Sequence, residues 1–204
     1  MEKHNGWWFP NGNLATAQAI FHEWDQKGRY VTGLCKQKRV CVQAGGNVGV
    51  FAKRLSTYFD TVHTWEPMPD NLECLDKNNM PDNVVLHRGA IGDEIGTVKI
   101  ASTIPNNCGA TQVEKGGDIQ LDTIDSLEAE VDLIWLDIEG FEYKALLGAM
   151  KTIEEYNPVI VIENKGLMPE FGGDLNGSKE FVDWMNSIGY KRKRRMMRDD
   201  IYTR

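Results

Sequence analysis

The stretch K-R-V-C-V-Q-A-G-G-N-V-G-V-F, residues 38–51, decides the fold of this chain. It begins with a β-rich run at residues 40–42, passes through a turn that contains Gly45, Gly46 and Gly49, and leads into a helical pattern. That order predicts a strand, a glycine loop and a helix. Residues without a side chain let backbone N–H groups and a helix N-terminus approach an anionic or polar cofactor. We therefore expect the other elements to hold this turn in place.

Length and composition indicate an ordinary globular chain. Its 204 residues, of which 41% are hydrophobic and 26% charged, favour a single domain over residues 1–204. Within it, residues 1–37 form an N-terminal arm and helix, and residues 38–204 form the core. No apolar run approaches the roughly 20 residues of a membrane helix, and the N-terminus lacks the apolar segment of a secretory signal. We expect a cytoplasmic protein without a membrane partner.

Charge and cysteine usage argue against two classes of function. The net charge of −7 argues against general binding to a nucleic-acid backbone. The four cysteines form no C-x-x-C pair and have no histidine at zinc-ligand spacing, so we expect buried, reduced thiols without a metal.

A basic run, K-R-K-R-R at residues 191–195, departs from the acidic balance of the chain. One interpretation is a solvated edge strand whose charges discourage aggregation between sheets. The other is a patch that binds a phosphate-bearing substrate.

Strand and helix patterns alternate over most of the chain. Strands are predicted at residues 40–42, 61–66, 83–87, 131–138 and 159–162, and helices at 14–24, 48–59, 70–79, 141–155 and 178–188. This alternation is typical of a parallel sheet, and right-handed crossovers place helices on both of its faces. The fold class is therefore α/β.

The remaining segments have weaker patterns. Residues 1–13 are interpreted as an irregular arm with aromatic side chains, and Gly28 and Gly33 are expected to break the chain after the first helix. Short β-like pieces occupy residues 89–127, of which 103–118 form a mobile loop or hairpin of the kind that often covers a site. The tail predicts two strands that turn near Asp199 and Asp200.

Ligands of an open parallel sheet bind at the carboxyl ends of its strands. Glu66 stands at such an end, 17 residues beyond Gly49, where a carboxylate can accept both hydrogen bonds of a ribose diol. An unpartnered surface glutamate is the alternative. The glycine turn itself, Ala44-x-Gly46-x-x-Gly49, matches a dinucleotide fingerprint only weakly because it lacks the first glycine.

Five sequence blocks together resemble one family. They are Q-A-G-G-N-V-G, W-E-P-M-P-D-N, R-G-A-I-G-D, L-D-I-E-G-F-E-Y-K-A-L-L-G-A and N-P-V-I-V-I-E, in this order over residues 38–165. The chain resembles FkbM-type methyltransferases that depend on S-adenosylmethionine. The resemblance implies a single domain with a Rossmann-like methyltransferase fold. Its seven-stranded sheet would be mostly parallel, with helices on both faces and an antiparallel C-terminal hairpin.

The resemblance also implies a set of cofactor-binding residues. The glycine turn would contact the methionine end, Glu66 the ribose and the segment after the third strand the adenine edge. The set comprises Gln43, Ala44, Gly45, Gly46, Asn47, Gly49, Glu66, Pro67, Gly89, Ala90 and Ile91. Gln43 departs from the family, which usually has an aspartate there. A neutral amide can brace the turn but does not attract the ammonium group of the cofactor.

The candidate catalytic residues are Asp137, Glu139, Glu163 and Lys165, which come after two neighbouring strands. Clustered acids raise one another's proton affinity, so Asp137 or Glu163 is expected to act as general base for a hydroxyl nucleophile. Glu139 is alternatively an acid that stabilises a helix N-terminus. The three acids could also hold Mg²⁺ against a sugar diol, but carboxylates cluster without metals and we predict no metal.

The leading hypothesis is an O-methyltransferase that acts on a hydroxyl of a sugar or other small polar metabolite. Methylation of an RNA ribose is an alternative, supported only by the basic run. A cofactor-binding module without catalysis is a further alternative, motivated by Gln43. A nicotinamide-dependent dehydrogenase is disfavoured because the length leaves little room for a second substrate domain.

Overall fold

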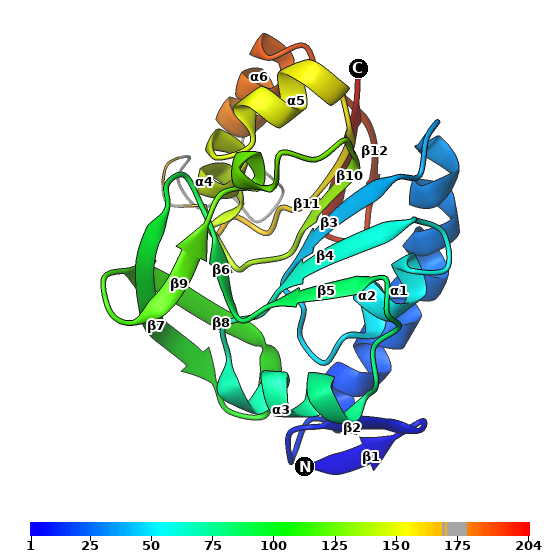
Figure 1. Cartoon of the computed structure of the whole chain (residues 1–204), viewed down its shortest axis with the longest axis vertical. Helices are drawn as coiled ribbons and strands as arrows, with labels where there is room; N and C mark the ends of the chain where they lie inside the picture. Colours follow the sequence, from blue (N-terminus) through cyan, green and yellow to red (C-terminus); the bar gives the residue numbers. More distant parts are fainter. Residues whose placement is uncertain (169, 171–178) are drawn as a thin grey trace.

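A computed structural model describes residues 1–168, 170 and 179–204. Its main sheet has seven strands in the order β12-β13-β11-β10-β3-β4-β5 (Figure 1). These strands are β3 (Val40–Ala44), β4 (Thr61–Trp65), β5 (Val84–His87), β10 (Val131–Leu136), β11 (Val159–Glu163), β12 (Lys191–Met196) and β13 (Asp199–Thr203). The first five are parallel, whereas β13 pairs antiparallel with β11 and β12 pairs antiparallel with β13. The predicted Rossmann-like α/β fold with its C-terminal hairpin is confirmed.

Helices cover both faces of this sheet (Figure 1). They are α1 (Leu14–Leu34), α2 (Val50–Leu55), α3 (Pro69–Lys77), α4 (Glu142–Leu147), α5 (Met150–Tyr156) and α6 (Lys179–Ser187), with a 3₁₀ turn, η1, at Ile124–Leu127. Side chains of α1 and α2 pack on one face, and those of η1, α4, α5 and α6 pack on the other. Among the described helices, none is both long and apolar enough to cross a bilayer.

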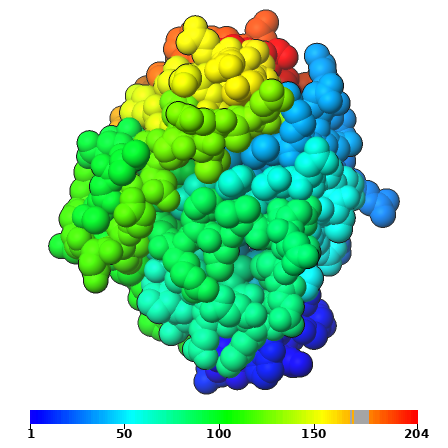
Figure 2. Space-filling model, in the orientation of Figure 1, coloured from blue at the N-terminus to red at the C-terminus, as the bar shows by residue number. Residues whose placement is uncertain are grey.

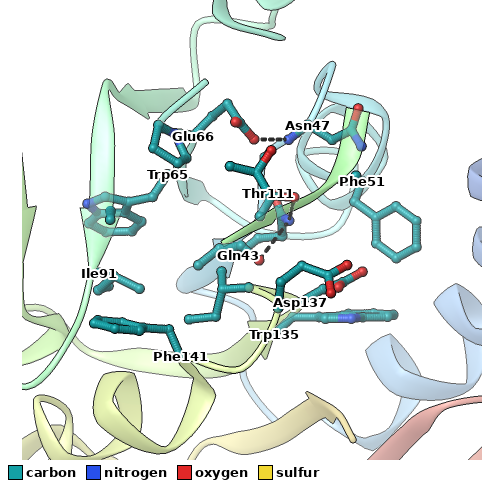
Figure 3. A pocket seen from close by; sticks show the side chains of 18 of the residues that line it. Gln43, Asn47, Phe51, Trp65, Glu66, Ile91, Thr111, Trp135, Asp137 and Phe141 are labelled. Carbon is teal, nitrogen blue, oxygen red and sulfur yellow. Dashed lines mark hydrogen bonds between the residues drawn. The ribbon is translucent and has the colours of Figure 1, made fainter. Parts of the chain in front are cut away.

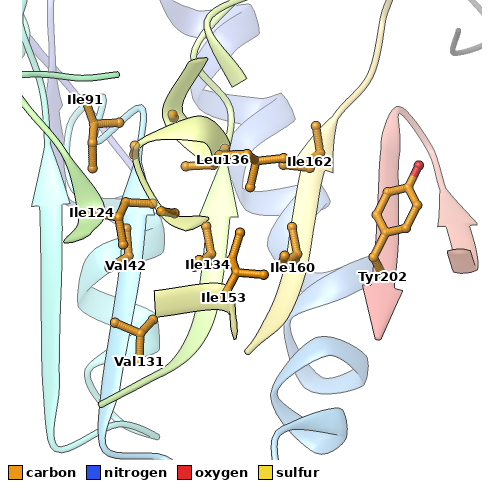
Figure 4. Close-up of a cluster of buried hydrophobic side chains, with 14 of the residues drawn as sticks. Val42, Ile91, Ile124, Val131, Ile134, Leu136, Ile153, Ile160, Ile162 and Tyr202 are labelled. Atoms are coloured by element: carbon orange, nitrogen blue, oxygen red, sulfur yellow. The ribbon is translucent and has the colours of Figure 1, made fainter. Parts of the chain in front are cut away.

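The central strand β10 is apolar at every position except Asp132. Successive side chains of a strand point to opposite faces of the sheet. Ile134 and Leu136 therefore pack in the cluster beneath α4–α6, which Figure 4 shows, whereas Leu133 and Trp135 pack beneath α1 and α2. A strand buried on both faces is therefore apolar at nearly every position, and Asp132 near the start of β10 pairs with Arg39.

A second sheet of four strands, in the order β6-β9-β7-β8, stands beside the first (Figure 1). Its strands are β6 (Gly89–Ile91), β7 (Gly96–Ile104), β8 (Asn107–Lys115) and β9 (Ile119–Asp122). This sheet forms over residues 89–127, where only short β-like pieces were expected. The predicted loop or hairpin at 103–118 is the β7–β8 hairpin. Its own core is small, with Val98, Leu121 and Phe141 buried together, which explains the weak apolar pattern.

The N-terminal arm is a hairpin and not irregular. Strands β1 (Glu2–His4) and β2 (Trp7–Phe9) pair antiparallel across Asn5 and Gly6, whose φ angles of 50° and 83° suit a tight hairpin turn. The Asn78 side chain fixes the hairpin, because Oδ1 accepts from the Trp8 N–H at 2.7 Å and Nδ2 donates to the Trp8 carbonyl at 3.0 Å. Figure 2 shows the hairpin in dark blue at one end of the molecule.

Helix α1 runs through both glycines that were expected to interrupt the chain. Gly28 lies beneath the Trp24 indole, where an added Cβ would come within 2.6 Å of the ring. Trp24 in turn stacks on Trp135 at 6.4 Å and contacts the Phe51 ring edge-on at 5.4 Å. The glycine at position 28 therefore makes room for an indole in the core and does not end the helix.

Alanine substitutions at the two glycines are expected to have opposite effects. Gly28→Ala should destabilise the fold by about 1–3 kcal/mol, because the Trp24 indole has to move within a packed core. At Gly33 no atom lies within 4 Å of an added Cβ, so Gly33→Ala should stabilise α1 by about 0.5–1 kcal/mol. Urea unfolding of both variants measures the difference, and equal effects would contradict this packing argument.

Three further predictions need correction or restriction. The helix expected over 141–155 is split into α4 and α5, because Gly148 approaches the backbone of Gly92 so closely that an added Cβ would lie 2.0 Å from its carbonyl oxygen. The C-terminal hairpin turns at Met197, with φ 57°, and Arg198, so Asp199 and Asp200 belong to β13. The first residue of the helix predicted over 178–188 lies outside the described residues, and α6 covers Lys179–Ser187.

Two minor predictions agree with the structure. The basic run forms β12, the edge strand of the main sheet. The four cysteines are free thiols, three of which are buried.

Candidate active site

A cavity lies at the carboxyl ends of β3, β4 and β10, and the second sheet and α1 complete its wall. Most of the predicted cofactor residues line it. These are Gln43, Ala44, Gly45, Gly46, Asn47, Glu66, Pro67, Gly89, Ala90 and Ile91. Gly49 does not line it. Gly49 precedes α2 and has a φ angle of 91°. A Cβ added there would lie 2.6 Å from the Leu75 side chain, so a glycine is needed for the backbone angle and the packing.

The turn after β3 is fixed by close backbone packing. Gly45 has φ 84°, and an added Cβ would lie 1.9 Å from the carbonyl oxygen of Asp137. The Gly46 N–H donates to the Trp65 carbonyl at 2.8 Å. The turn is thereby held against the ends of both neighbouring strands.

Gln43 is buried and braces this turn. Its Nε2 donates to the Gly45 carbonyl at 2.9 Å, and its Oε1 accepts from the Thr64 hydroxyl at 2.7 Å. Both ends of the amide are therefore engaged within the protein. Gln43 supplies order to the turn and no charge to the cavity.

Glu66 is buried at the end of β4 and organises three neighbours. Its carboxylate accepts from the Asn47 N–H at 2.6 Å, the Met68 N–H at 2.9 Å and the Asn71 amide at 3.2 Å (Figure 3 shows the first). Burial raises its pKa to about 7, although these hydrogen bonds oppose the shift. A carboxylate has about four acceptor positions, so the group retains capacity for a further donor from the cavity.

The cavity has two chemically different ends (Figure 3). Trp65, Ile91 and Phe141 stand at one end and provide apolar surface. Phe51 and Trp135 stand at the other, with the Asp137 carboxylate beside them.

Sequence reasoning missed several wall residues. Trp65, Trp135 and Phe141 have the pattern of core residues, and no motif marks the contribution of the β7–β8 hairpin. Helix α1 contributes Ile20, Glu23 and Lys27, which lie about one turn apart. The two charged residues beside the apolar stripe of this helix were the signal from which the sequence could have indicated a site. The missed residues are Ile20, Glu23, Lys27, Phe51, Trp65, Cys108, Gly109, Thr111, Val113, Trp135, Ile138 and Phe141.

The four predicted catalytic residues come together at the ends of β10 and β11. Carboxylate oxygens of Asp137, Glu139 and Glu163 lie within 4.8 Å of one another. The Lys165 ammonium contacts Glu139 at 2.6 Å and Glu163 at 2.7 Å. The positive charge of Lys165 thus offsets part of the repulsion in the cluster.

The environment raises the proton affinity of the cluster. Burial, the neighbouring Glu163 carboxylate and a hydrogen bond with it raise the pKa of Asp137 well above its ordinary value. Burial also raises the pKa of Glu139, against the opposing effect of Lys165. Burial by itself would lower the pKa of Lys165, but the adjacent carboxylates raise it, so the ammonium stays charged. Asp137 therefore binds a proton more tightly than an exposed carboxyl does.

The D-I-E-G-F-E block owes its loop geometry to Glu142. This buried carboxylate accepts from the N–H groups of Ile138 and Gly140, both at 2.9 Å. The loop between them contains two positive φ angles, 56° at Glu139 and 105° at Gly140. Burial raises the pKa of Glu142 to about 8. The second glutamate of the block thus holds Glu139 in place and does not face the cavity.

A polar groove continues from the cavity past the carboxylate cluster. The β7–β8 hairpin and the N-terminal half of α1 form its sides, and residues from both strand ends form its base. The residues that line it are Ala15, Thr16, Ala19, Ile20, Glu23, Asn47, Asn106, Asn107, Gly109, Asp137, Glu139, Glu163, Lys165 and Arg198. Asp137 and Glu139 line both the groove and the cavity.

The family model of the methyltransferase FkbM domain matches residues 43–192 of this chain. The chain belongs to the FkbM methyltransferase family. It carries an S-adenosylmethionine-dependent methyltransferase domain. No curated protein matches this FkbM chain.

Solved structures share its fold. The FkbM methyltransferase of Methylobacillus flagellatus KT has a TM-score of 0.55 and 21% identity, over 84% of this chain and 45% of that one. This FkbM chain therefore spans less than half the length of that structure. The precorrin 8w decarboxylase of Methanobacterium thermoautotrophicum has a TM-score of 0.49 and 14% identity, over 100% and 96% of the two chains. Magnesium protoporphyrin IX methyltransferase of Synechocystis PCC 6803, solved with bound S-adenosylmethionine, has a TM-score of 0.47 and 11% identity, over 99% and 84%.

The chemistry of the cavity fits the cofactor of the FkbM family. Apolar side chains at one end suit an adenine ring, and Glu66 has acceptor capacity for a ribose hydroxyl. Side chains of opposite charge also line the cavity, among them Lys27 and Glu23, and they suit an amino-acid group.

Proposed function

We propose that this domain transfers a methyl group from S-adenosylmethionine to a hydroxyl of a sugar or other small polar metabolite. The supporting observation is the continuity of the cavity with the polar groove. Asp137 and Glu139 line both, so a group in the cavity and a group in the groove would meet at these carboxylates.

The lining of the groove favours a neutral acceptor rich in hydroxyl groups. Asn106 and Asn107 offer amide groups, the acids offer carboxylates, and Ala15 and Ala19 leave room between them. Amides and carboxylates accept hydrogen bonds from hydroxyls readily. Among the described residues that line the groove, none is aromatic, although recognition of unpaired RNA bases generally uses aromatic stacking. The lining therefore favours a sugar over an RNA ribose.

The proposed role of the cluster is to remove the proton of the acceptor hydroxyl. When bound, S-adenosylmethionine supplies an activated methyl group on a sulfonium. Burial and the neighbouring Glu163 raise the pKa of Asp137, and its ionised carboxylate can accept the hydroxyl proton as general base. Lys165 and Glu139 hold Glu163 and the loop in position.

Calorimetric titration tests the cofactor, and a radiolabel transfer assay tests the acceptor. We expect saturable binding of S-adenosylmethionine and S-adenosylhomocysteine, no binding of NAD, and labelled product with a member of a sugar panel. Binding without transfer to any hydroxyl acceptor would instead indicate a module without catalysis. No binding of either adenosyl compound would overturn the proposal.

Neutralising the basic run is expected to leave this activity unchanged. In β12, Arg192 and Arg195 contact the buried Asp200, whereas Lys191, Lys193 and Arg194 are exposed. A variant with Gln at these three exposed positions should turn over a small acceptor within about twofold of the wild type, since surface charges far from a contact act weakly. Loss of tight RNA binding and of RNA methylation in the same variant would favour the RNA alternative.

We further propose that residues 1–204 act as one methyltransferase domain in the cytoplasm. The N-terminal 37 residues pack on the core, since Trp24 stacks on Trp135 and Lys27 pairs with Asp199. Free thiols at all four cysteines support a reducing compartment.

A further inference from the structure

The amino-acid end of the cofactor carries two opposite charges, an ammonium and a carboxylate. Gln43 is a neutral amide, and both of its ends are engaged in the turn. Glu66 also holds the turn, and its remaining acceptor capacity suits the proposed ribose hydroxyl. Neither residue supplies a pair of opposite charges, so other side chains must recognise this end.

Helix α1 brings one cation to the cavity. Among the described residues that line the cavity, Lys27 is the single lysine, arginine or histidine. Its side chain is 3% exposed and pairs with Asp199, and Glu23 lies 3.5 Å away on the preceding turn. Burial disfavours its charge, but Asp199 and Glu23 raise the pKa of Lys27 above its ordinary value, so the ammonium is retained.

The position of Lys27 matches the polar end of the cavity. Trp24, one turn earlier on α1, packs on Trp135 and Phe51, which stand beside Asp137 (Figure 3). Trp65, Ile91 and Phe141 stand at the opposite, apolar end. A ligand with its adenine against the apolar end would therefore extend its amino-acid end toward α1.

Hydrogen-bonding capacity remains for such a ligand. A lysine ammonium has three donors, and the two carboxylates account for two of them. Glu23 also lines the cavity, and its side chain is 30% exposed, so it has free acceptor positions. Lys27 and Glu23 thus offer a cation and an anion next to each other.

We propose that Lys27 binds the carboxylate and Glu23 the ammonium of the cofactor's amino-acid end. This inference rests on the proposed function, because it presupposes an adenosyl cofactor in the cavity. Both residues precede residue 43, at which the family match begins, and Asp199, which holds Lys27, lies beyond residue 192, at which it ends. Lys27 and Glu23 therefore come from a part of this chain outside the matched segment.

Three ligands and two variants test the assignment by calorimetry. S-Adenosylhomocysteine has both charges, its decarboxylated analogue keeps only the ammonium, and methylthioadenosine has neither. Lys27→Met should weaken binding of S-adenosylhomocysteine about 10- to 100-fold and leave the other two ligands unchanged. Glu23→Gln should weaken S-adenosylhomocysteine and the decarboxylated analogue, and leave methylthioadenosine unchanged. Lys36→Met, at an exposed lysine, is the matched control.

Stability is checked separately, because Lys27→Met leaves Asp199 buried without its partner. The double variant Lys27→Met with Asp199→Asn removes both charges and should show the same ligand pattern. Equal weakening of all three ligands, or of none, would overturn the assignment. If the wild type binds methylthioadenosine and S-adenosylhomocysteine equally, only this inference fails. If it binds neither, the proposed function fails with it.

Discussion

An Asp137→Asn variant is expected to lose methyl transfer by about 10²- to 10⁴-fold in kcat, the range that general-base catalysis contributes. The asparagine amide cannot accept the hydroxyl proton, so the variant lacks the proposed general base. Steady-state assays with the best acceptor of the sugar panel measure the loss. Glu128→Gln, at an exposed acid after η1, is the control and should keep full activity.

The pH profile separates chemistry from binding. In the wild type kcat should rise with pH as Asp137 loses its proton, since burial and the neighbouring Glu163 raise its pKa well above the ordinary value. The Asp137→Asn variant should lose this rise of kcat with pH. Its affinity for S-adenosylhomocysteine should stay within about tenfold of the wild-type value, since most contacts with the ligand remain. A variant with wild-type kcat would remove Asp137 from the mechanism.

The same substitution should stabilise the fold at neutral pH. A carboxyl whose pKa is raised in the folded state contributes its stability below the ordinary pKa and loses it as pH rises through the raised value. Asp137 is such a group, so replacing it with a neutral asparagine removes a cost present at pH 7. We expect a gain of about 0.5–2 kcal/mol in the free energy of unfolding. A loss of kcat together with a gain in the free energy of unfolding would show that Asp137 serves activity and not stability.

A Glu66→Ala variant is expected to lose cofactor affinity by about 30- to 1000-fold, the range for truncating a buried, hydrogen-bonded charge. The change removes the acceptor for a ribose hydroxyl and also frees the Asn47 and Met68 N–H groups that hold the turn. Calorimetry with S-adenosylhomocysteine measures it. Glu94→Ala, at an exposed surface acid, is the control.

The pH dependence of Glu66 gives a second test. Its pKa of about 7 is raised from an ordinary value of 4.5, so its contribution to stability is full below pH 4.5 and is lost as pH rises to 7. Ligand affinity should run the other way and fall below pH 7, because the protonated group is a poorer acceptor. Glu66→Gln should abolish both trends. A pH-independent affinity in the wild type would rule out a ribose contact.

The main sheet could be predicted because its strands are locally unambiguous. β10 is apolar at nearly every position and β11 likewise, which allows only a buried central strand. Position along the chain then placed Glu66, Asp137 and Glu163 at the same sheet edge, since parallel strands end together. The cluster around Lys165 is a consequence of that topology.

The second sheet and the C-terminal half of α1 could not be predicted because their cues depend on distant residues, whereas the predicted helix over 14–24 is the N-terminal half of α1. The β7–β8 hairpin is largely polar and is ordered by pairing with β9, which no local pattern reports. Gly28 looks like a helix breaker until the Trp24 indole is placed over it. Lys27 looks like a surface residue until Asp199, 172 positions away, is brought beside it.

The C-terminal hairpin gives the boundaries of the family match a physical meaning. β13 pairs with β11 along its length, so a protein cut at residue 192 would present β11 as an open sheet edge. Unpaired edges recruit other strands, and such a fragment should self-associate. Removing the residues before residue 43 would also remove Trp24, whose indole stacks on Trp135. A recombinant protein limited to residues 43–192 is thus expected to aggregate. The residues on either side of this segment are needed for the domain to fold.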